Sequence, residues 1–254
     1  MTPRHFTRRR FLAAAAVTAS SAPLISRTRR PIRAIAFDAF VLFDPRAIVN
    51  RARELAGDKG DALAAAASAK LFGYTWYYTS AGRYAAFDEL AADAFNSAAQ
   101  NLGLKLGNPE LDWLVSGYSK LELWPDVRDA LQTLSRHGVR LAMLSNMSER
   151  ALRANLGAGR IDQHFEFVLS TDAVRQYKPG PRAYYLAVRA FGVPKNQVGF
   201  AASASWDASG ATWFGLPTAW VNRNGLPPEP AHATPLVVSS GMGGVLQLAS
   251  LEPA

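Results

Sequence analysis

Four short polar segments, each at or after the end of a stretch typical of a buried strand, constrain this chain more than any other feature. They are Asp38 after Ile35-Ala36-Phe37, Ser145-Asn146 after Met143-Leu144, Lys178 in Tyr177-Lys178-Pro179, and Asp207 in the stretch that follows Phe200. In an open parallel sheet the carboxyl ends of the strands face one crevice, where ligands bind. The pattern therefore predicts one site with two carboxylates, an ammonium group, a hydroxyl and an amide.

The order of the hydrophobic patterns predicts an α/β protein whose sheet domain is split. Residues 32–38 are expected to form the first strand, and residues 45–122 are rich in Ala, Leu and aromatic residues in a helical pattern. From Pro125 onward, helices alternate with strands at 139–144, 165–169, 198–201 and 218–221, as in βαβ units. We expect a doubly wound, Rossmann-like parallel sheet from residues 31–44 and 123–254, with residues 45–122 inserted as a helical cap.

Basic residues are concentrated at the start of the chain. Residues 1–30 contain seven arginines and no acidic residue, so the formal charge of +8 falls to +1 for the remainder. A nearly neutral remainder does not predict a surface that follows nucleic-acid phosphates. The sequence therefore predicts no nucleic-acid partner.

The basic start resembles a twin-arginine export signal. Thr7-Arg8-Arg9-Arg10-Phe11-Leu12 precedes the apolar run Ala13–Ala19, which is too short to span a membrane. We expect residues 1–30 to be a leader, the twin-arginine translocation machinery to be a partner during export, and the protein to be periplasmic. The alternative is a disordered basic tail.

Asp38 and Lys178 form the first chemical pair. A carboxylate at the end of a strand buried on both faces is costly unless it is paired, and Lys178 is the natural cation. An ionised, desolvated carboxylate held in this way is a competent nucleophile, whereas the alternative is a structural salt bridge. The chain has no cysteine, so a thiol nucleophile is excluded.

The other polar segments each have two interpretations. Ser145 and Asn146 suit an anionic group such as a carboxylate, but they could equally cap a helix. Asp207 either stabilises a helix N-terminus or faces the nucleophile. The aromatic residues of 45–122 are more typical of a helix core than of a substrate cage. No histidine falls at a strand end, so a Ser–His–Asp triad is not expected.

With these residues in place, the chain resembles the haloacid dehalogenase superfamily, and within it the L-2-haloacid dehalogenase (type II) branch. The resemblance covers residues 32–225. Its most specific segments are Tyr74-Thr75-Trp76, Gly82-Arg83-Tyr84, Leu144-Ser145-Asn146, Tyr177-Lys178-Pro179 with Tyr184, and Trp206-Asp207-Ala208-Ser209-Gly210-Ala211.

The resemblance implies hydrolytic dehalogenation of small (S)-2-haloacids. Asp38 would attack C2 and form an aspartyl ester, Lys178 would orient Asp38, and Asp207 would position or activate water. The remaining implied residues bind the substrate: Ser145 and Asn146 hold its carboxylate, Tyr184 supports the site, and Phe87 and Trp206 form an apolar wall.

The resemblance also implies that no metal or other cofactor takes part. The phosphatases of the superfamily carry a second Asp two residues after the nucleophile and an acidic ligand in the last motif. Phe40 and the Ala202-Ser203 neighbourhood occupy those positions here. Mg²⁺ requires oxygen ligands, and a halide, unlike an alcohol, needs no proton in order to leave.

Two alternatives remain open at this point: a small-acid binding protein that has lost turnover, and a hydrolase of a different small activated acid. Asp38, Lys178 and Asp207 favour an enzyme. Ser68 stands where the branch has an arginine in its cap, and Ala202 and Ala204 stand where it has Ser and Asn, which favours a binding protein. The sequence leaves open whether the chain forms a homodimer.

Overall fold

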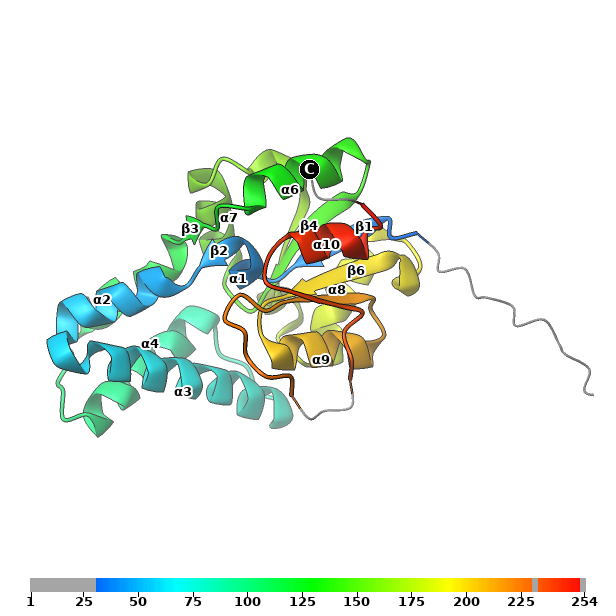
Figure 1. Cartoon of the computed structure of the whole chain (residues 1–254). Helices are drawn as coiled ribbons and strands as arrows, with labels where there is room; N and C mark the ends of the chain where they lie inside the picture. Colours follow the sequence, from blue (N-terminus) through cyan, green and yellow to red (C-terminus); the bar gives the residue numbers. More distant parts are fainter. Residues whose placement is uncertain (1–30, 230–232, 252–254) are drawn as a thin grey trace, which may run out of the picture.

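The computed structural model describes residues 31–229 and 233–251, so the expected leader at residues 1–30 lies outside the described residues. Its centre is a parallel six-stranded sheet with the order β5-β4-β1-β6-β7-β8 (Figure 1). The strands are β1 (Ala34–Phe37), β4 (Arg140–Ser145), β5 (Phe165–Ser170), β6 (Val198–Ala202), β7 (Thr218–Val221) and β8 (Val237–Ser239). The α/β fold with a doubly wound parallel sheet is confirmed.

Alternate residues of β1 face opposite sides of the sheet, as the twofold period of a strand requires. Ile35 and Phe37 pack in one hydrophobic cluster, whereas Ala34 and Ala36 pack in the other. The first cluster includes buried residues of α6 (Val127–Arg136), α7 (Glu149–Ala158) and α10 (Gly243–Leu248), and the second includes residues of α8 (Pro181–Phe191) and α9 (Ser205–Phe214). Helices therefore cover both faces of the sheet.

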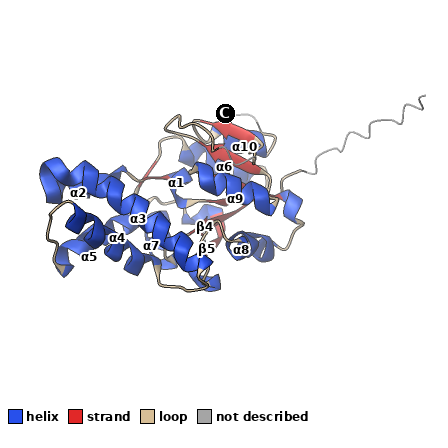
Figure 2. Cartoon of the chain, turned by 90° about the horizontal axis from the view of Figure 1, so that it is seen from below, coloured by secondary structure: helices blue, strands red, loops and turns tan. Residues whose placement is uncertain are grey.

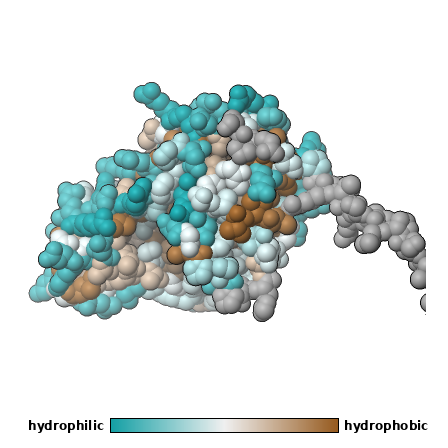
Figure 3. All heavy atoms as spheres, in the orientation of Figure 1, coloured by the Kyte–Doolittle hydropathy of each residue, from teal (hydrophilic) through white to brown (hydrophobic). Residues whose placement is uncertain are grey.

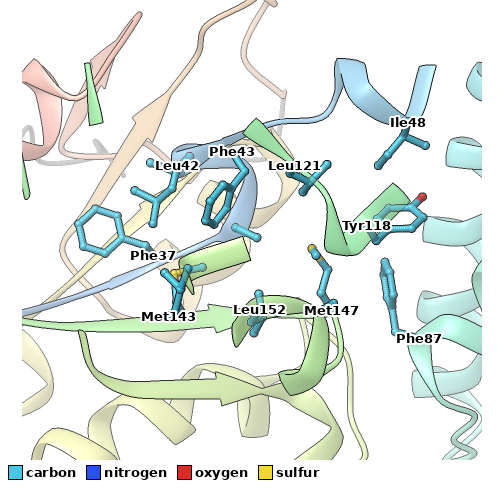
Figure 4. Close-up of a cluster of buried hydrophobic side chains, with 14 of the residues drawn as sticks. Phe37, Leu42, Phe43, Ile48, Phe87, Tyr118, Leu121, Met143, Met147 and Leu152 are labelled. Carbon is cyan, nitrogen blue, oxygen red and sulfur yellow. The ribbon is translucent and has the colours of Figure 1, made fainter. Parts of the chain in front are cut away.

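Between β1 and the rest of the sheet the chain forms a group of helices. These are α2 (Arg46–Ala56), α3 (Gly60–Ser80), α4 (Phe87–Asn101) and α5 (Asn108–Ser116), which we call the helical insertion. They lie together on one side of the molecule (Figures 1 and 2). Buried side chains of the insertion continue the first hydrophobic cluster, and Figure 4 shows Ile48, Phe87 and Tyr118 beside the core residues Met147 and Leu121.

Several elements differ from the sequence prediction. The short helix α1 (Ala39–Leu42) follows Asp38 directly, and β2 (Phe43–Asp44) pairs with β3 (Glu122–Leu123) as an antiparallel ribbon at the two ends of the insertion. Strand β8 was not expected, because the last strand predicted from the sequence is that at 218–221. The first of the helices expected from Pro125 onward begins at Val127, and the side chain of Asp126, just before it, accepts hydrogen bonds from Arg223 and from the Met242 backbone N–H. Short 3-10 helices occupy Gly57–Lys59, Gly117–Ser119, Asp162–His164, Thr171–Val174 and Lys195–Gln197.

The surface seen in Figure 3 is mostly hydrophilic, with small hydrophobic patches. Large apolar side chains that are exposed include Tyr77, Tyr185 and Trp213. Among the helices of residues 31–229 and 233–251, none combines the length and the apolar character that a membrane crossing needs.

Candidate active site

The local backbone positions Asp38 at the carboxyl end of β1. Its backbone N–H donates to the Ala201 carbonyl, which extends the β1–β6 pairing by one residue. Its side chain caps α1, because Oδ2 accepts a hydrogen bond of 3.0 Å from the Phe40 backbone N–H. The carboxylate is therefore held at the sheet edge by the turn that begins there.

A buried lysine joins Asp38 to the second carboxylate. Lys178 Nζ lies 2.8 Å from Asp38 Oδ1 and 2.6 Å from Asp207 Oδ2. Asp207 Oδ1 in turn accepts a 2.7 Å hydrogen bond from the Tyr184 hydroxyl. We call Asp38, Lys178, Asp207 and Tyr184 the charge network. The convergence expected from the strand ends is therefore observed.

The charge network shifts the pKa values of its members. Burial alone would lower the pKa of Lys178, but the adjacent Asp207 and Asp38 outweigh it and raise that pKa above its usual value. Burial raises the pKa of Asp207 to about 6; the charge of Asp38 adds to this, while Lys178 and the Tyr184 hydroxyl oppose it. Lys178 is therefore a permanent cation, whereas Asp207 changes its charge in mildly acidic solution.

Ser145 and Asn146 lie beside this network at the end of β4. Ser145 Oγ accepts from the Met147 backbone N–H, and Asn146 Oδ1 accepts from the Lys178 backbone N–H at 2.9 Å. The Asn146 Nδ2 group is buried and has no hydrogen-bond partner. An unsatisfied buried donor costs free energy, so this amide is prepared to donate to an anionic ligand. Helix capping is supplied instead by Ser148, whose Oγ accepts from the Ala151 backbone N–H.

A cavity of about 30 Å³ lies in front of these groups, and we call it the active-site cavity. Its walls include seven of the eight expected site residues: Asp38, Lys178, Asp207, Ser145, Asn146, Phe87 and Trp206. Tyr184 is the exception, because it is fully buried behind Asp207 and its hydroxyl donates to that residue.

Five further residues on the wall were not assigned to substrate contact by sequence reasoning: Phe40, Phe72, Met147, Ser203 and Ala204. Phe40 and Met147 each follow a predicted site residue within two positions, which is a signal that could have found them. Phe72 was grouped with the helix core, but its ring lies 5.4 Å from that of Trp206. At least part of the aromatic set therefore faces the cavity rather than the interior of the insertion.

The donor set does not suit a divalent cation. Phe40 and the Ala202-Ser203 neighbourhood occupy the positions where the resemblance places the phosphatase carboxylates, and Ala202 is fully buried in β6. Across residues 31–229 and 233–251, no group of three or more His, Cys, Asp or Glu side chains is arranged to hold a metal ion. Among the described residues, the carboxylates on the cavity wall are those of Asp38 and Asp207, and both are engaged by Lys178.

A family model described as haloacid dehalogenase-like hydrolase matches residues 32–215 of the chain. The chain belongs to this family of hydrolases. It is 35% identical over 218 residues to the (S)-2-haloacid dehalogenase of Pseudomonas sp. (strain YL), an alignment covering 85% of this chain and 94% of the relative. Haloacetate dehalogenase H-2 of Moraxella sp. (strain B) is 32% identical, with 86% of this chain and 98% of the relative covered.

Solved structures of the family have the same fold as this hydrolase. A crystal structure of an L-2-haloacid dehalogenase superposes with a TM-score of 0.84 at 38% identity, covering 87% of this chain and 99% of the other. The L-2-haloacid dehalogenase of Xanthobacter autotrophicus, solved with chloropropionic acid covalently bound, has a TM-score of 0.80 at 26% identity, with coverages of 86% and 98%.

Proposed function

We propose that this hydrolase removes halide from small (S)-2-haloacids by way of an aspartyl ester on Asp38. One observation carries the proposal: the active-site cavity has an ion-paired carboxylate on its wall beside a buried amide donor, Asn146 Nδ2, that lacks a partner. A 2-haloacid supplies both complementary groups, because its carboxylate accepts from the amide while its C2 receives the nucleophile.

In the first step an Asp38 oxygen forms a bond to C2, and the carbon–halogen bond breaks with its electron pair on the halide. Asn146, together with Ser145, binds the substrate carboxylate, and Lys178 orients Asp38 through their 2.8 Å ion pair. Phe87, Phe72 and Trp206 exclude water on the apolar side. Halide needs no proton in order to leave. This agrees with Phe40 two positions after Asp38, where the phosphatases of the superfamily carry an acidic residue.

In the second step water attacks the carbonyl carbon of the ester, and the 2-hydroxy acid leaves with an oxygen that came from Asp38. We assign acceptance of the water proton to Asp207, because this carboxylate lies on the cavity wall and its pKa of about 6 is close to that of an effective general base. Tyr184 fixes the orientation of Asp207 through its hydroxyl. The names of the relatives, (S)-2-haloacid dehalogenase and haloacetate dehalogenase, support this substrate class.

A single turnover in ¹⁸O-labelled water tests the covalent step. We expect largely unlabelled hydroxy acid and ¹⁸O on Asp38, measured by mass spectrometry of product and of the Asp38 peptide. Asp38→Asn should abolish halide release while the far-UV spectrum and unfolding temperature stay close to those of the parent, because the amide has the same shape but is a poor nucleophile. Fully labelled first-turnover product would contradict the ester.

We further propose that residues 31–44 and 123–254 act as the core and residues 45–122 as its cap, and that residues 1–30 direct twin-arginine export to the periplasm. The arginine-rich start and its short apolar run support export. Replacing both Arg8 and Arg9 by Lys should leave the protein in the cytoplasm, as measured by cell fractionation. The same replacement of Arg29 and Arg30 is the matched control and should leave export unchanged.

A further inference from the structure

A second cavity, of about 220 Å³, lies beside the active-site cavity, and we call it the apolar chamber. The two cavities share five wall residues, which are Phe40, Phe72, Phe87, Ser203 and Ala204. Because these residues face both spaces, a group that extends beyond the active-site cavity on this side enters the apolar chamber. None of the charged residues of the site lies on the chamber wall.

The far wall of the chamber comes from the helical insertion. Ile48 and Val49 of α2 and Ala64, Ser68 and Leu71 of α3 line it, and Tyr118 closes it beside Phe87, with the two rings 5.1 Å apart. Figure 4 shows Ile48, Tyr118 and Phe87 close together at this point. The volume of the chamber depends on two small residues of α3. Ala64 and Ser68 lie four positions apart, so both fall on the face of the helix that lines the chamber. Ala64 is buried, whereas Ser68 is exposed, so the chamber opens toward solvent at Ser68.

The size of each space limits what it can hold. The active-site cavity, about 30 Å³, is much smaller than the chamber, so an alkyl chain attached to the reacting carbon has to extend out of it. The chamber has about 220 Å³, and an apolar cavity of roughly 150 Å³ accommodates benzene. Its wall offers hydroxyl groups at Ser68, Tyr118 and Ser203 but no charged side chain to bind a second ionic group. Its size and its apolar wall thus suit a saturated hydrocarbon chain.

We propose that the apolar chamber binds an alkyl chain of about four to six carbons attached to C2 of the substrate. This inference rests on the proposed function, since it places C2 of a 2-haloacid next to Asp38. The chamber selects medium-length 2-haloalkanoic acids over two- and three-carbon acids, because each methylene buried there adds favourable transfer from water. This gain in binding free energy ends where the alkyl chain of the substrate reaches solvent at Ser68.

The test compares (S)-2-bromo acids from propanoate to octanoate. We expect kcat/KM to rise by up to about fourfold per methylene, for a total of roughly 50-fold or more, before it levels off. Ala64→Leu should remove the rise of kcat/KM with chain length, because the larger side chain fills the chamber. Ser68→Trp should reduce the same rise by narrowing the mouth of the chamber. Ser68 is exposed, so this second variant does not require the core to repack. Ala65→Leu places the same side chain on the exposed face of α3 and should leave the series unchanged.

Binding of unreactive acids separates this inference from the proposed function. Calorimetry with acetate and hexanoate needs no turnover, and hexanoate should bind at least tenfold more tightly to the parent protein and to Ala65→Leu. Ala64→Leu and Ser68→Trp should narrow that difference, with thermal unfolding measured alongside to show that both are folded. Equal binding of the two acids, or a chain-length preference that survives both variants, would overturn the chamber assignment whether or not halide is released.

Discussion

The strand ends and the helical insertion contribute different chemistry to the same crevice. At the strand ends, Lys178 is 1% exposed and each of its two carboxylate partners lies within 2.8 Å. The insertion supplies apolar and aromatic side chains, among them Phe72, Phe87 and Leu71. Charges that are buried and mutually paired are intolerant of change, whereas an apolar wall can be reshaped one residue at a time. We therefore expect the strand ends to decide the rate of the reaction and the insertion to decide which acid is used.

The strongest test of this comparison is Lys178→Met. Removing the ammonium leaves two buried carboxylates without their shared partner, so the free energy of unfolding should fall by about 3–5 kcal/mol. We expect kcat/KM for a 2-haloacid to fall by about 10³-fold or more, because Asp38 loses its orientation. Urea unfolding and halide release measure the two effects.

Lys120→Met, at an exposed lysine, is the matched control and should change the free energy of unfolding by less than about 0.5 kcal/mol. Retention of more than a tenth of the parental rate by Lys178→Met would show that the charge network is structural only.

The pH dependence should follow Asp207. Its carboxyl gains a proton below a pH of about 6, so ester hydrolysis should slow by about tenfold per pH unit below that value. Stability changes in the opposite direction. Because the folded-state pKa is raised above the ordinary 3.8, the stability contribution is complete below pH 4 and is lost as the pH rises through 6, by about 3 kcal/mol at most.

Asp207→Asn tests whether Asp207 is the group that makes stability depend on pH. The unfolding free energy of that variant should lose its dependence on pH between 4 and 6, as measured by urea unfolding across that range. A dependence that persists unchanged in Asp207→Asn would assign the titration to another group.

A substitution in the helical insertion should lower kcat/KM without changing its pH dependence. Phe72→Ala removes a ring that faces both cavities and packs on Trp206. We expect kcat/KM to fall by about five- to tenfold through the loss of apolar contact, with the pH profile unchanged. Tyr77→Ala removes an exposed aromatic residue from the same helix and should have no effect on rate. If the acidic limb of the pH–rate profile shifted in Phe72→Ala, the helical insertion would influence the titration at the strand ends, and the two regions would not have separate roles.

Sequence reasoning identified the strand ends better than it identified the insertion, for a physical reason. Asp38, Ser145 and Asp207 each follow an apolar run, and parallel strands end at the same edge of a sheet. The ribbon of β2 and β3 was missed because two-residue strands have no periodicity of their own. The three-residue strand β8, which pairs with β7, is also too short to show a periodicity. The apolar chamber depends on how α2 and α3 pack over the core, which no local pattern specifies.

The smallest expected effect is that of metal removal. Mg²⁺ binds through carboxylates and other oxygen ligands, and phosphatase chemistry on this fold needs such groups beside the nucleophile. Here Phe40 and the Ala202-Ser203 neighbourhood offer no carboxylate, and the two carboxylates of the charge network are already neutralised in part by Lys178. Dialysis against EDTA should therefore leave kcat/KM within measurement error, and added Mg²⁺ should not raise it. The control is a Mg²⁺-dependent phosphatase treated in the same way, which should lose its activity. A rate that falls with EDTA and returns with Mg²⁺ would mean that the strand-end region works through a metal rather than through Lys178.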